Sequence, residues 1–257
     1  MLTIYNLLID IGNTNTKWLL IPTEYPLNKA SNLPLYTFSN QFPEFDKINN
    51  NIDNLNINKV LISNVSSENY LILLIQSLNI NINKISIYKT PKSYKNLINN
   101  YKDYTTLGTD RWLSMIAVNQ MYETQANIII SCGSATTIDI INNNIFIGGY
   151  IIAGLNFMQN ILLNKTAKIN THLNDEEIKS SIRLGLNTKE CVEHGAILAQ
   201  VGFIEKAIFS FIKDKDIVKY NCIIHGGAAE KICPFISLPH EKMNNLVVLG
   251  LSKVLND

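Results

Sequence analysis

The first group of residues suited to chemistry lies in a polar stretch near the N-terminus. The apolar run at residues 4–9 ends at Asp10, and small polar residues then lead to Lys17 and a second apolar run. This pattern predicts two strands joined by a tight turn. Gly12 and Asn13 tolerate positive φ, so the turn can be sharp, and its N–H groups could converge on a phosphate. An ordinary hairpin with a polar tip is the alternative.

The spacing of Asp10 and Lys17 adds charge to this turn. A lysine beside the β- and γ-phosphates of a nucleotide would offset charge repulsion during phosphoryl transfer. The carboxylate could hold a hydrated cation or orient water. The stretch therefore predicts a turn that binds the phosphates of a nucleotide, provided that the chain contains a second turn of the same kind.

A partner turn does occur in the second half of the chain. The apolar residues 126–131 lead through Cys132-Gly133-Ser134 to a predicted strand at 136–141, and Gly226-Gly227 later follows another predicted strand. This repeats the order strand, small polar turn, strand. Two like-built domains facing each other would bring both turns to one ligand.

A third group precedes a predicted helix. Gly108, Thr109, Asp110 and Arg111 come directly before Trp112 and a helical pattern. An aspartate there suits a general base toward an alcohol, and a planar, permanently charged arginine suits a carboxylate or phosphate. The simpler interpretation is that Thr109 or Asp110 only caps the helix and Arg111 is its surface neighbour.

The remaining pattern supplies elements to position these groups. Strands are predicted at residues 4–9, 18–21, 35–39, 59–63, 84–88, 126–131, 136–141, 145–152 and 219–225, with a loop at 24–34. Helices are predicted at 42–55, 66–78, 155–163, 188–212 and 245–255, with Ser66 or Ser67 as the cap of the second. We therefore expect an α/β fold of two duplicated domains, 1–117 and 118–257, each a mixed sheet with flanking helices.

Composition limits the classes of protein. The chain has 257 residues, 46% of them hydrophobic, which excludes a disordered chain. Lys+Arg 22 against Asp+Glu 21 gives a net charge of +1, so no nucleic-acid surface is expected. The four cysteines form no CxxC pair, and neither a signal peptide nor 18 uninterrupted apolar residues is visible. We expect a cytoplasmic protein with reduced thiols and no membrane span.

With these motifs in order, the chain resembles one family over nearly its whole length, the type III pantothenate kinases, whose fold is that of actin-like ATPases and ribonuclease H. The matching segments are Asp10-Ile11-Gly12-Asn13-Thr14 with Lys17, Tyr101, Gly108-Thr109-Asp110-Arg111-Trp112, Gly133-Ser134-Ala135-Thr136-Thr137-Ile138-Asp139, Phe146-Ile147-Gly148-Gly149-Tyr150-Ile151, Gly154-Leu155, Thr166-Ala167, Gly185-Leu186-Asn187-Thr188, Gly226-Gly227 and Leu246-Val247-Val248-Leu249-Gly250-Leu251. Individually, only the Gly-Thr-Asp-Arg segment is diagnostic.

The resemblance implies phosphorylation of pantothenate to 4′-phosphopantothenate by ATP, the first step of coenzyme A biosynthesis. It implies that Asp110 takes the hydroxyl proton as that oxygen attacks the γ-phosphorus. The implied ATP-binding residues are Asp10, Ile11, Gly12, Asn13, Thr14, Asn15, Thr16, Lys17 and Ser134, and those implied to bind pantothenate are Tyr101, Gly108, Thr109, Asp110, Arg111 and Thr188. The family is also homodimeric, uses ATP with Mg²⁺ and requires a monovalent cation, potassium or ammonium.

The chain departs from the family's pattern at the cation position. Ser131 stands where the family has its potassium-ligating Asp, so the hydroxyl and nearby carbonyls would coordinate the ion without a full negative charge. A weak response to potassium is therefore predicted. Tyr104 replaces a common Pro, and His194 and His225 stand where smaller residues are usual; polar structural roles are expected for both histidines.

Two other functions fit parts of the sequence. The family includes Bvg accessory factors, so the chain could be a transcriptional regulator with a retained or decayed kinase site. The near-neutral charge disfavours direct DNA binding, and the retained Asp10, Lys17, Asp110 and Arg111 disfavour a dead site. A kinase for another small alcohol fits the fold but leaves the Gly-Thr-Asp-Arg segment unexplained.

Overall fold

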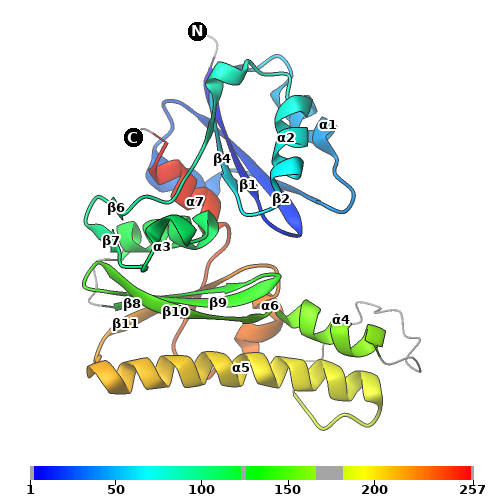
Figure 1. Ribbon diagram of the computed structural model, residues 1–257, viewed down its shortest axis with the longest axis vertical. Coiled ribbons are helices and arrows are strands. Elements are labelled where there is room, and N and C mark those ends of the chain that lie inside the picture. Colours follow the sequence, from blue (N-terminus) through cyan, green and yellow to red (C-terminus); the bar gives the residue numbers. More distant parts are fainter. Residues whose placement is uncertain (1–2, 123–125, 166–181, 256–257) are drawn as a thin grey trace. The chain divides into compact units, whose positions relative to one another are not determined.

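The computed structural model describes residues 3–122, 126–165 and 182–255, in two compact units (Figure 1). One unit comprises residues 1–121 together with 245–257, and the other comprises residues 122–244. The C-terminal segment thus belongs with the N-terminal half of the chain. The division between residues 117 and 118 expected from the sequence stays a prediction, and the Thr166-Ala167 match lies outside the described residues.

The first unit contains a mixed sheet in the order β3-β2-β1-β4-β5. Its strands are β1 Ile4–Ile11, β2 Asn15–Pro22, β3 Leu35–Ser39, β4 Asn56–Asn64 and β5 Ile85–Ile87. β1 pairs antiparallel with β2 and parallel with β4, so the carboxyl ends of β1 and β4 meet at one edge. The strands predicted in this half of the chain are all present.

Helices cover both faces of this sheet. They are α1 Phe45–Ile52, α2 Glu68–Ser77, α3 Thr109–Met121 and α7 Leu246–Lys253. α1 and α2 close a core over Leu7 and Ile9 of β1, while α7 contacts β1 and also packs against α3 (Figure 1). Ser67 caps α2 by accepting a hydrogen bond from the Tyr70 N–H, as predicted.

Shorter elements fill the connections of this unit. They are the 3₁₀ helices η1 Leu27–Asn32, η2 Ile82–Lys84 and η3 Tyr104–Thr106 and the hairpin strands β6 Ser93–Tyr94 and β7 Leu97–Asn99. The segment predicted as a plain loop at 24–34 therefore contains a 3₁₀ turn.

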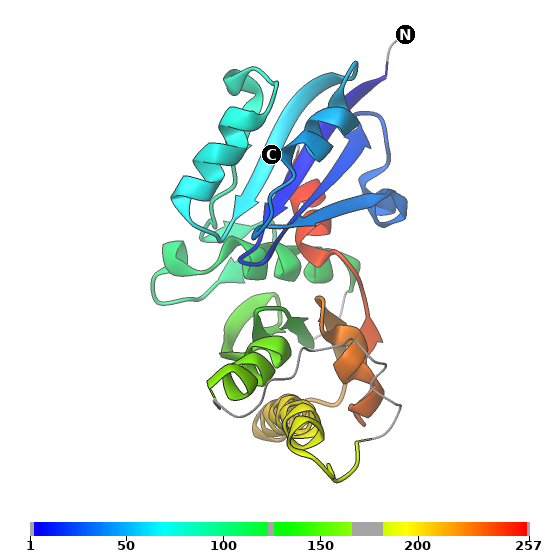
Figure 2. The ribbon, with the colours of Figure 1, turned by 90° about the vertical axis from the view of Figure 1, so that its right-hand side faces the viewer.

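The second unit has its own mixed sheet, ordered β12-β11-β8-β9-β10. Its strands are β8 Ala126–Cys132, β9 Ala135–Asn142, β10 Ile145–Ala153, β11 Tyr220–His225 and β12 Glu241–Lys242. Its helices are α4 Leu155–Lys165, α5 Thr188–Lys215, α6 Ala229–Ile232 and the 3₁₀ helix η4 Cys233–Phe235. α4 lies beside α5, and α5 runs along one face of the sheet (Figures 1 and 2).

Helix α5 is long and apolar enough to cross a membrane by length and composition alone. Several of its apolar side chains, including Ile197, Ile204 and Ile208, instead pack in the core of the second unit against strand residues such as Ile130 and Ile224. This packing is that of the core helix of a globular unit.

Candidate active site

The polar turn after β1 is held by backbone bonds and by Asn40. The Gly12 N–H donates to the Asn15 carbonyl (3.0 Å), and the Asn40 amide donates to the Gly12 carbonyl (2.7 Å). Neither Gly12 nor Asn13 has positive φ, so the turn does not use the left-handed backbone that both residues tolerate. The hydrogen bonds from Gly12 and Asn40 hold the turn instead.

Two residues predicted to bind ATP have fully buried side chains. Ile11 is fully buried in the sheet core. Thr16 is also fully buried, and its hydroxyl donates to Asn40 Oδ1 (2.7 Å) and lies 3.1 Å from the Tyr70 hydroxyl. These two residues can meet a phosphate only through their backbone groups.

Asp10 brings negative charge to the base of the turn. It is 8% exposed, and burial raises its pKa to about 7, with the nearby charge of Asp110 as the second cause. Lys17, its partner across the β1–β2 ladder, and a hydrogen bond from Ser63 oppose this shift. The Asp10 Oδ1 atom is buried without a hydrogen-bond partner, which is an unfavourable state for a carboxylate oxygen that meets no ligand.

The Gly-Thr-Asp-Arg segment forms the start of α3. The helix begins at Thr109, and the Trp112 N–H donates to the Gly108 carbonyl (3.1 Å), so Thr109 and Asp110 lie in the first turn. The expectation that one of them caps the helix is therefore wrong. The Asp110 carboxylate accepts from the Arg111 N–H (2.8 Å), and burial raises its pKa.

Gly108 makes room for this carboxylate. A Cβ atom at Gly108 would lie 2.7 Å from Asp110 Oδ1. Arg111 lies over the ring of Tyr101, with 5.8 Å between the guanidinium carbon and the ring centroid, and Tyr101 is 38% exposed. An arginine cation and the N–H groups of a helix start both attract small anions.

The second unit holds the partner turn. The Gly133 N–H donates to the Ala135 carbonyl, and the Gly154 N–H donates to the Ser134 carbonyl, both at 3.0 Å. A Cβ at Gly154 would meet the Gly133 carbonyl oxygen at 2.1 Å, so the backbone approach requires glycine there. Gly226 has a φ of 104°, and a Cβ there would meet the Cys132 carbonyl oxygen at 2.5 Å.

Ser131 and Thr188 also belong to the second unit. Ser131 pairs across the sheet with Thr137 of β9 and with His225 of β11, which is buried. Thr188 is the first residue of α5, which Asn187 caps by accepting from the Glu190 N–H (2.9 Å). Ser131, Ser134 and Thr188 are thus set within one unit, whereas Asp10, Lys17, Tyr101 and residues 108–111 are set within the other.

The sequence analysis missed two residues of the first unit. Asn40 clasps the turn, and Ser63 lies beside Asp10 in the parallel register of β1 and β4. Ser63 also lies 3.0 Å from Thr109, oxygen to oxygen. The place of Ser63 depends on which residues of β1 and β4 pair, and a single sequence gives no direct signal of that register.

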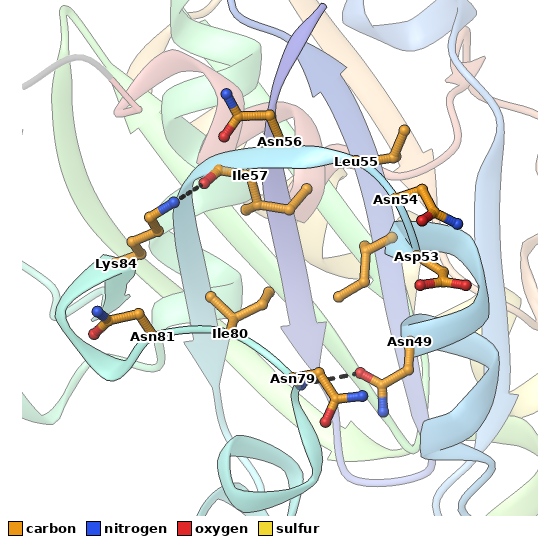
Figure 3. Close-up of a pocket in the computed structure, with 11 residues that line it drawn as sticks. Asn49, Asp53, Asn54, Leu55, Asn56, Ile57, Asn79, Ile80, Asn81 and Lys84 are labelled. Atoms are coloured by element: carbon orange, nitrogen blue, oxygen red, sulfur yellow. Dashed lines mark hydrogen bonds between the residues drawn. The ribbon is translucent and has the colours of Figure 1, made fainter. Parts of the chain in front are cut away.

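A pocket of about 270 Å³ opens elsewhere on the first unit (Figure 3). Asparagine side chains, Asp53 and Lys84 line it near the start of β4, and the Lys84 ammonium donates to the Ile57 carbonyl. Ile4 of β1 pairs with Asn56 of β4, so this pocket lies at the opposite end of these strands from Asp10. It contains none of the predicted site residues. Within the described ranges no group of three His, Cys, Asp or Glu side chains is arranged to hold a metal ion.

Comparisons with solved structures identify the fold. A Baf family transcriptional activator from Campylobacter jejuni matches with a TM-score of 0.56 and 20% identity, covering 97% of this chain and 96% of that one. MreB 5 of Spiroplasma citri, bound to AMPPNP, matches with a TM-score of 0.53 and 11% identity, covering 100% and 97%. At these identities the likeness shows the fold alone, and it confirms the expected actin-like class.

Comparisons of sequence identify the family. A protein from Herminiimonas arsenicoxydans named type III pantothenate kinase is 28% identical over 255 residues, 96% of each chain. One of the same name from Nitrosococcus oceani is 30% identical over 263 residues, 98% of this chain and 94% of that protein. The model of the type III pantothenate kinase family matches residues 6–209. The chain therefore belongs to the type III pantothenate kinase family.

Proposed function

We propose that this chain transfers the γ-phosphoryl group of ATP to the hydroxyl of pantothenate, forming 4′-phosphopantothenate in the first step of coenzyme A biosynthesis. Its family and its named relatives support a pantothenate kinase. The observation that carries the mechanism is that Asp10, which is buried, lies near the half-buried Asp110. Ser63, the register partner of Asp10, lies 3.0 Å from Thr109, oxygen to oxygen, and the charge of Asp110 raises the pKa of Asp10.

Asp110 is the proposed proton acceptor. A general base works best with a pKa near the working pH, and burial moves the pKa of Asp110 upward. Asp110 lies in the first turn of α3, and the N–H groups of a helix start would attract the substrate's negative oxygens. Arg111 on Tyr101 would bind the pantothenate carboxylate, and Thr188 is proposed as a further pantothenate-binding residue.

The β1–β2 turn and Ser134 are proposed to hold the triphosphate. The backbone of residues 11–16 and the ammonium group of Lys17 would neutralise its charge, so that positioning and electrostatics do most of the catalysis. Mg²⁺ carried by ATP would supply further charge neutralisation on the phosphates. The buried Asp10 Oδ1 without a hydrogen-bond partner fits a hydrated cation or water at this place.

Ser131, at the position implied for the monovalent cation, lacks the negative charge of a carboxylate. Its cross-strand neighbours are the hydroxyl of Thr137 and the imidazole of His225, and neither is a carboxylate. Hydroxyl and carbonyl oxygens alone bind potassium less strongly than a set that includes a charged ligand. We therefore propose that potassium or ammonium stimulates this enzyme only weakly.

A rate assay tests this proposal directly. Replacing sodium by potassium or ammonium at constant ionic strength should change turnover by less than about threefold, which corresponds to under 1 kcal/mol. Ser131→Asp should strengthen the response. A steep potassium requirement in the unmodified chain contradicts the proposal.

Oligomeric state and location complete the proposal. Exposed apolar side chains on β10 and α4, among them Tyr150, Ile151 and Phe157, support a homodimer. We place the enzyme in solution in the cytoplasm, because the apolar helix α5 packs as a core helix.

The decisive experiment is an ADP-release assay. Pantothenate is supplied alongside a panel of sugars and polyols, with mass spectrometry of the product. Among the acceptors tested with ATP, we expect only pantothenate to give ADP and a phosphorylated product. ADP release with a sugar but not with pantothenate would indicate a kinase for another alcohol. If none of the acceptors gives ADP release, and the chain also fails to rescue a pantothenate-kinase-deficient strain, the proposed reaction is overturned.

A further inference from the structure

Ser63 is a polar residue with no exposure to solvent at the end of β4. Its hydroxyl oxygen lies 3.0 Å from the hydroxyl oxygen of Thr109, the first residue of α3. It is also the register partner of Asp10 on the neighbouring strand β1 and hydrogen-bonds the Asp10 carboxylate. One side chain thus joins the base of the phosphate turn to the helix that carries Asp110.

The direction of these bonds follows from hydrogen-bond chemistry. An ionised carboxylate can only accept, so the single Ser63 proton goes to Asp10. The Ser63 oxygen is then free to accept, and the Thr109 hydroxyl donates to it. The chain of donors runs Thr109 to Ser63 to Asp10 for as long as Asp10 is ionised, and every member belongs to the first unit.

We propose that Ser63 is a positioning residue that fixes the first turn of α3 against the phosphate turn, and so holds Asp110 at a set distance from the bound triphosphate. The role rests on the proposed kinase function. Because Ser63 is fully buried, it acts through Thr109 and Asp10 rather than by touching either substrate. A displacement of about 1 Å in a reacting group can cost on the order of 100-fold in rate.

The test separates positioning from binding and from folding. Ser63→Ala should lower kcat about 10- to 100-fold while the KM values for ATP and pantothenate change by less than about threefold. Thr109→Val should show a similar loss, and Thr109→Ser, which keeps the hydroxyl, should recover most of it. The double variant Ser63→Ala/Thr109→Val should be little worse than either single variant, since the two hydroxyls act as one chain.

Ser252→Ala is the matched control. Ser252 is also fully buried in the first unit, and its hydroxyl donates to the Leu249 carbonyl (2.7 Å) within α7, so the variant loses one buried bond outside the chain of donors. It should leave kcat unchanged. Amide hydrogen exchange at residues 109–113 should be faster in Ser63→Ala than in Ser252→Ala, a readout that needs no substrate.

Each outcome decides the proposal. A kcat for Ser63→Ala within twofold of the unmodified enzyme, additive losses in the double variant, or equal exchange in Ser63→Ala and the control would overturn it. If Ser63→Ala does not fold, the contrast between Thr109→Val and Thr109→Ser decides. If the unmodified chain lacks pantothenate kinase activity, the kinase proposal fails on that result alone, and hydrogen exchange still tests the role of Ser63.

Discussion

Asp110 is the residue on which the proposed chemistry depends most. Its carboxylate accepts a hydrogen bond from the Arg111 N–H and lies in the first turn of α3, where Gly108 leaves room for it. The amide of Asp110→Asn has nearly the same shape but cannot accept the hydroxyl proton. We expect this variant to keep ATP binding nearly intact and to lower turnover by about 10²- to 10⁴-fold, the usual contribution of a general base.

Calorimetric titration with an ATP analogue and a turnover assay together measure this effect. Asp103→Asn offers a control, because Asp103 caps η3 and its carboxylate accepts local bonds from Thr105. Near-normal turnover in Asp110→Asn would show that another group accepts the proton.

The raised pKa of Asp10 makes the stability of the fold depend on pH. Burial and the charge of Asp110 raise its pKa to about 7 in the folded chain, against 3.8 for an unperturbed group. Between these values the folded state holds a proton that the unfolded chain lacks, so stability falls as pH rises through this window. Asp10→Asn has no carboxyl group to ionise at this position, so the variant does not lose this stability as pH rises. We expect the variant to gain at least about 2–4 °C in Tm over the unmodified apo-protein at pH 8, less at pH 4.5, and to bind ATP more weakly.

Thermal unfolding of both proteins at pH 8 and pH 4.5 tests whether the Tm difference is larger at the higher pH. Asp53→Asn, which changes an exposed carboxylate of the same unit, should show no such dependence of its Tm difference on pH. A Tm advantage of Asp10→Asn that is equal or larger at pH 4.5 would contradict the raised pKa.

Among the elements, α7 shows how a C-terminal segment supports the site. A Cβ at Gly250 would lie 2.2 Å from the Leu113 carbonyl oxygen of α3, so the two helices meet backbone to backbone. Gly250→Ala must push α3 away from α7. We expect a loss of about 1–3 kcal/mol in the free energy of unfolding, the usual cost of overpacking, and a lower kcat because α3 carries Asp110.

Gly202→Ala is the opposite case. Gly202 lies inside α5, where an added Cβ meets nothing within 4 Å, so alanine should stabilise by about 0.5–1 kcal/mol through helix propensity. Chemical denaturation of both variants measures the contrast. Equal stability of Gly250→Ala and Gly202→Ala would show that the α3–α7 contact yields easily.

The elements were largely predictable from the sequence because apolar runs bounded by small polar residues are a local signal. β1, β2 and the capped α2 followed from such runs. The turn between β1 and β2 was predicted, and its binding of phosphate stays a prediction. The contact with Asn40 was not predicted, because Asn40 is distant along the chain. Ser63 was missed for the same reason: its role depends on strand register, and one sequence contains no direct record of which residues pair.

At the scale of the whole molecule, the exposed apolar residues of the second unit predict that a second copy of the chain binds there. Ile151 on β10 and Phe157 on α4 are 56% and 55% exposed, on elements consecutive along the chain. Side chains of this size rarely gather on the surface of a soluble monomer without covering. We expect light scattering after gel filtration to give twice the 29.0 kDa chain mass at micromolar concentration.

Charge substitutions can locate that surface. Phe157→Glu should shift the mass toward that of one chain, because a carboxylate buried without a partner opposes association. Phe42→Glu is its control, since Phe42 is 71% exposed but belongs to the first unit. A dimer that survives Phe157→Glu but dissociates with Phe42→Glu would assign the interface to the first unit, and a mass of 29.0 kDa for the unmodified chain would refute the homodimer. Where dimerisation is lost, the pantothenate KM shows whether the second copy helps to complete the site.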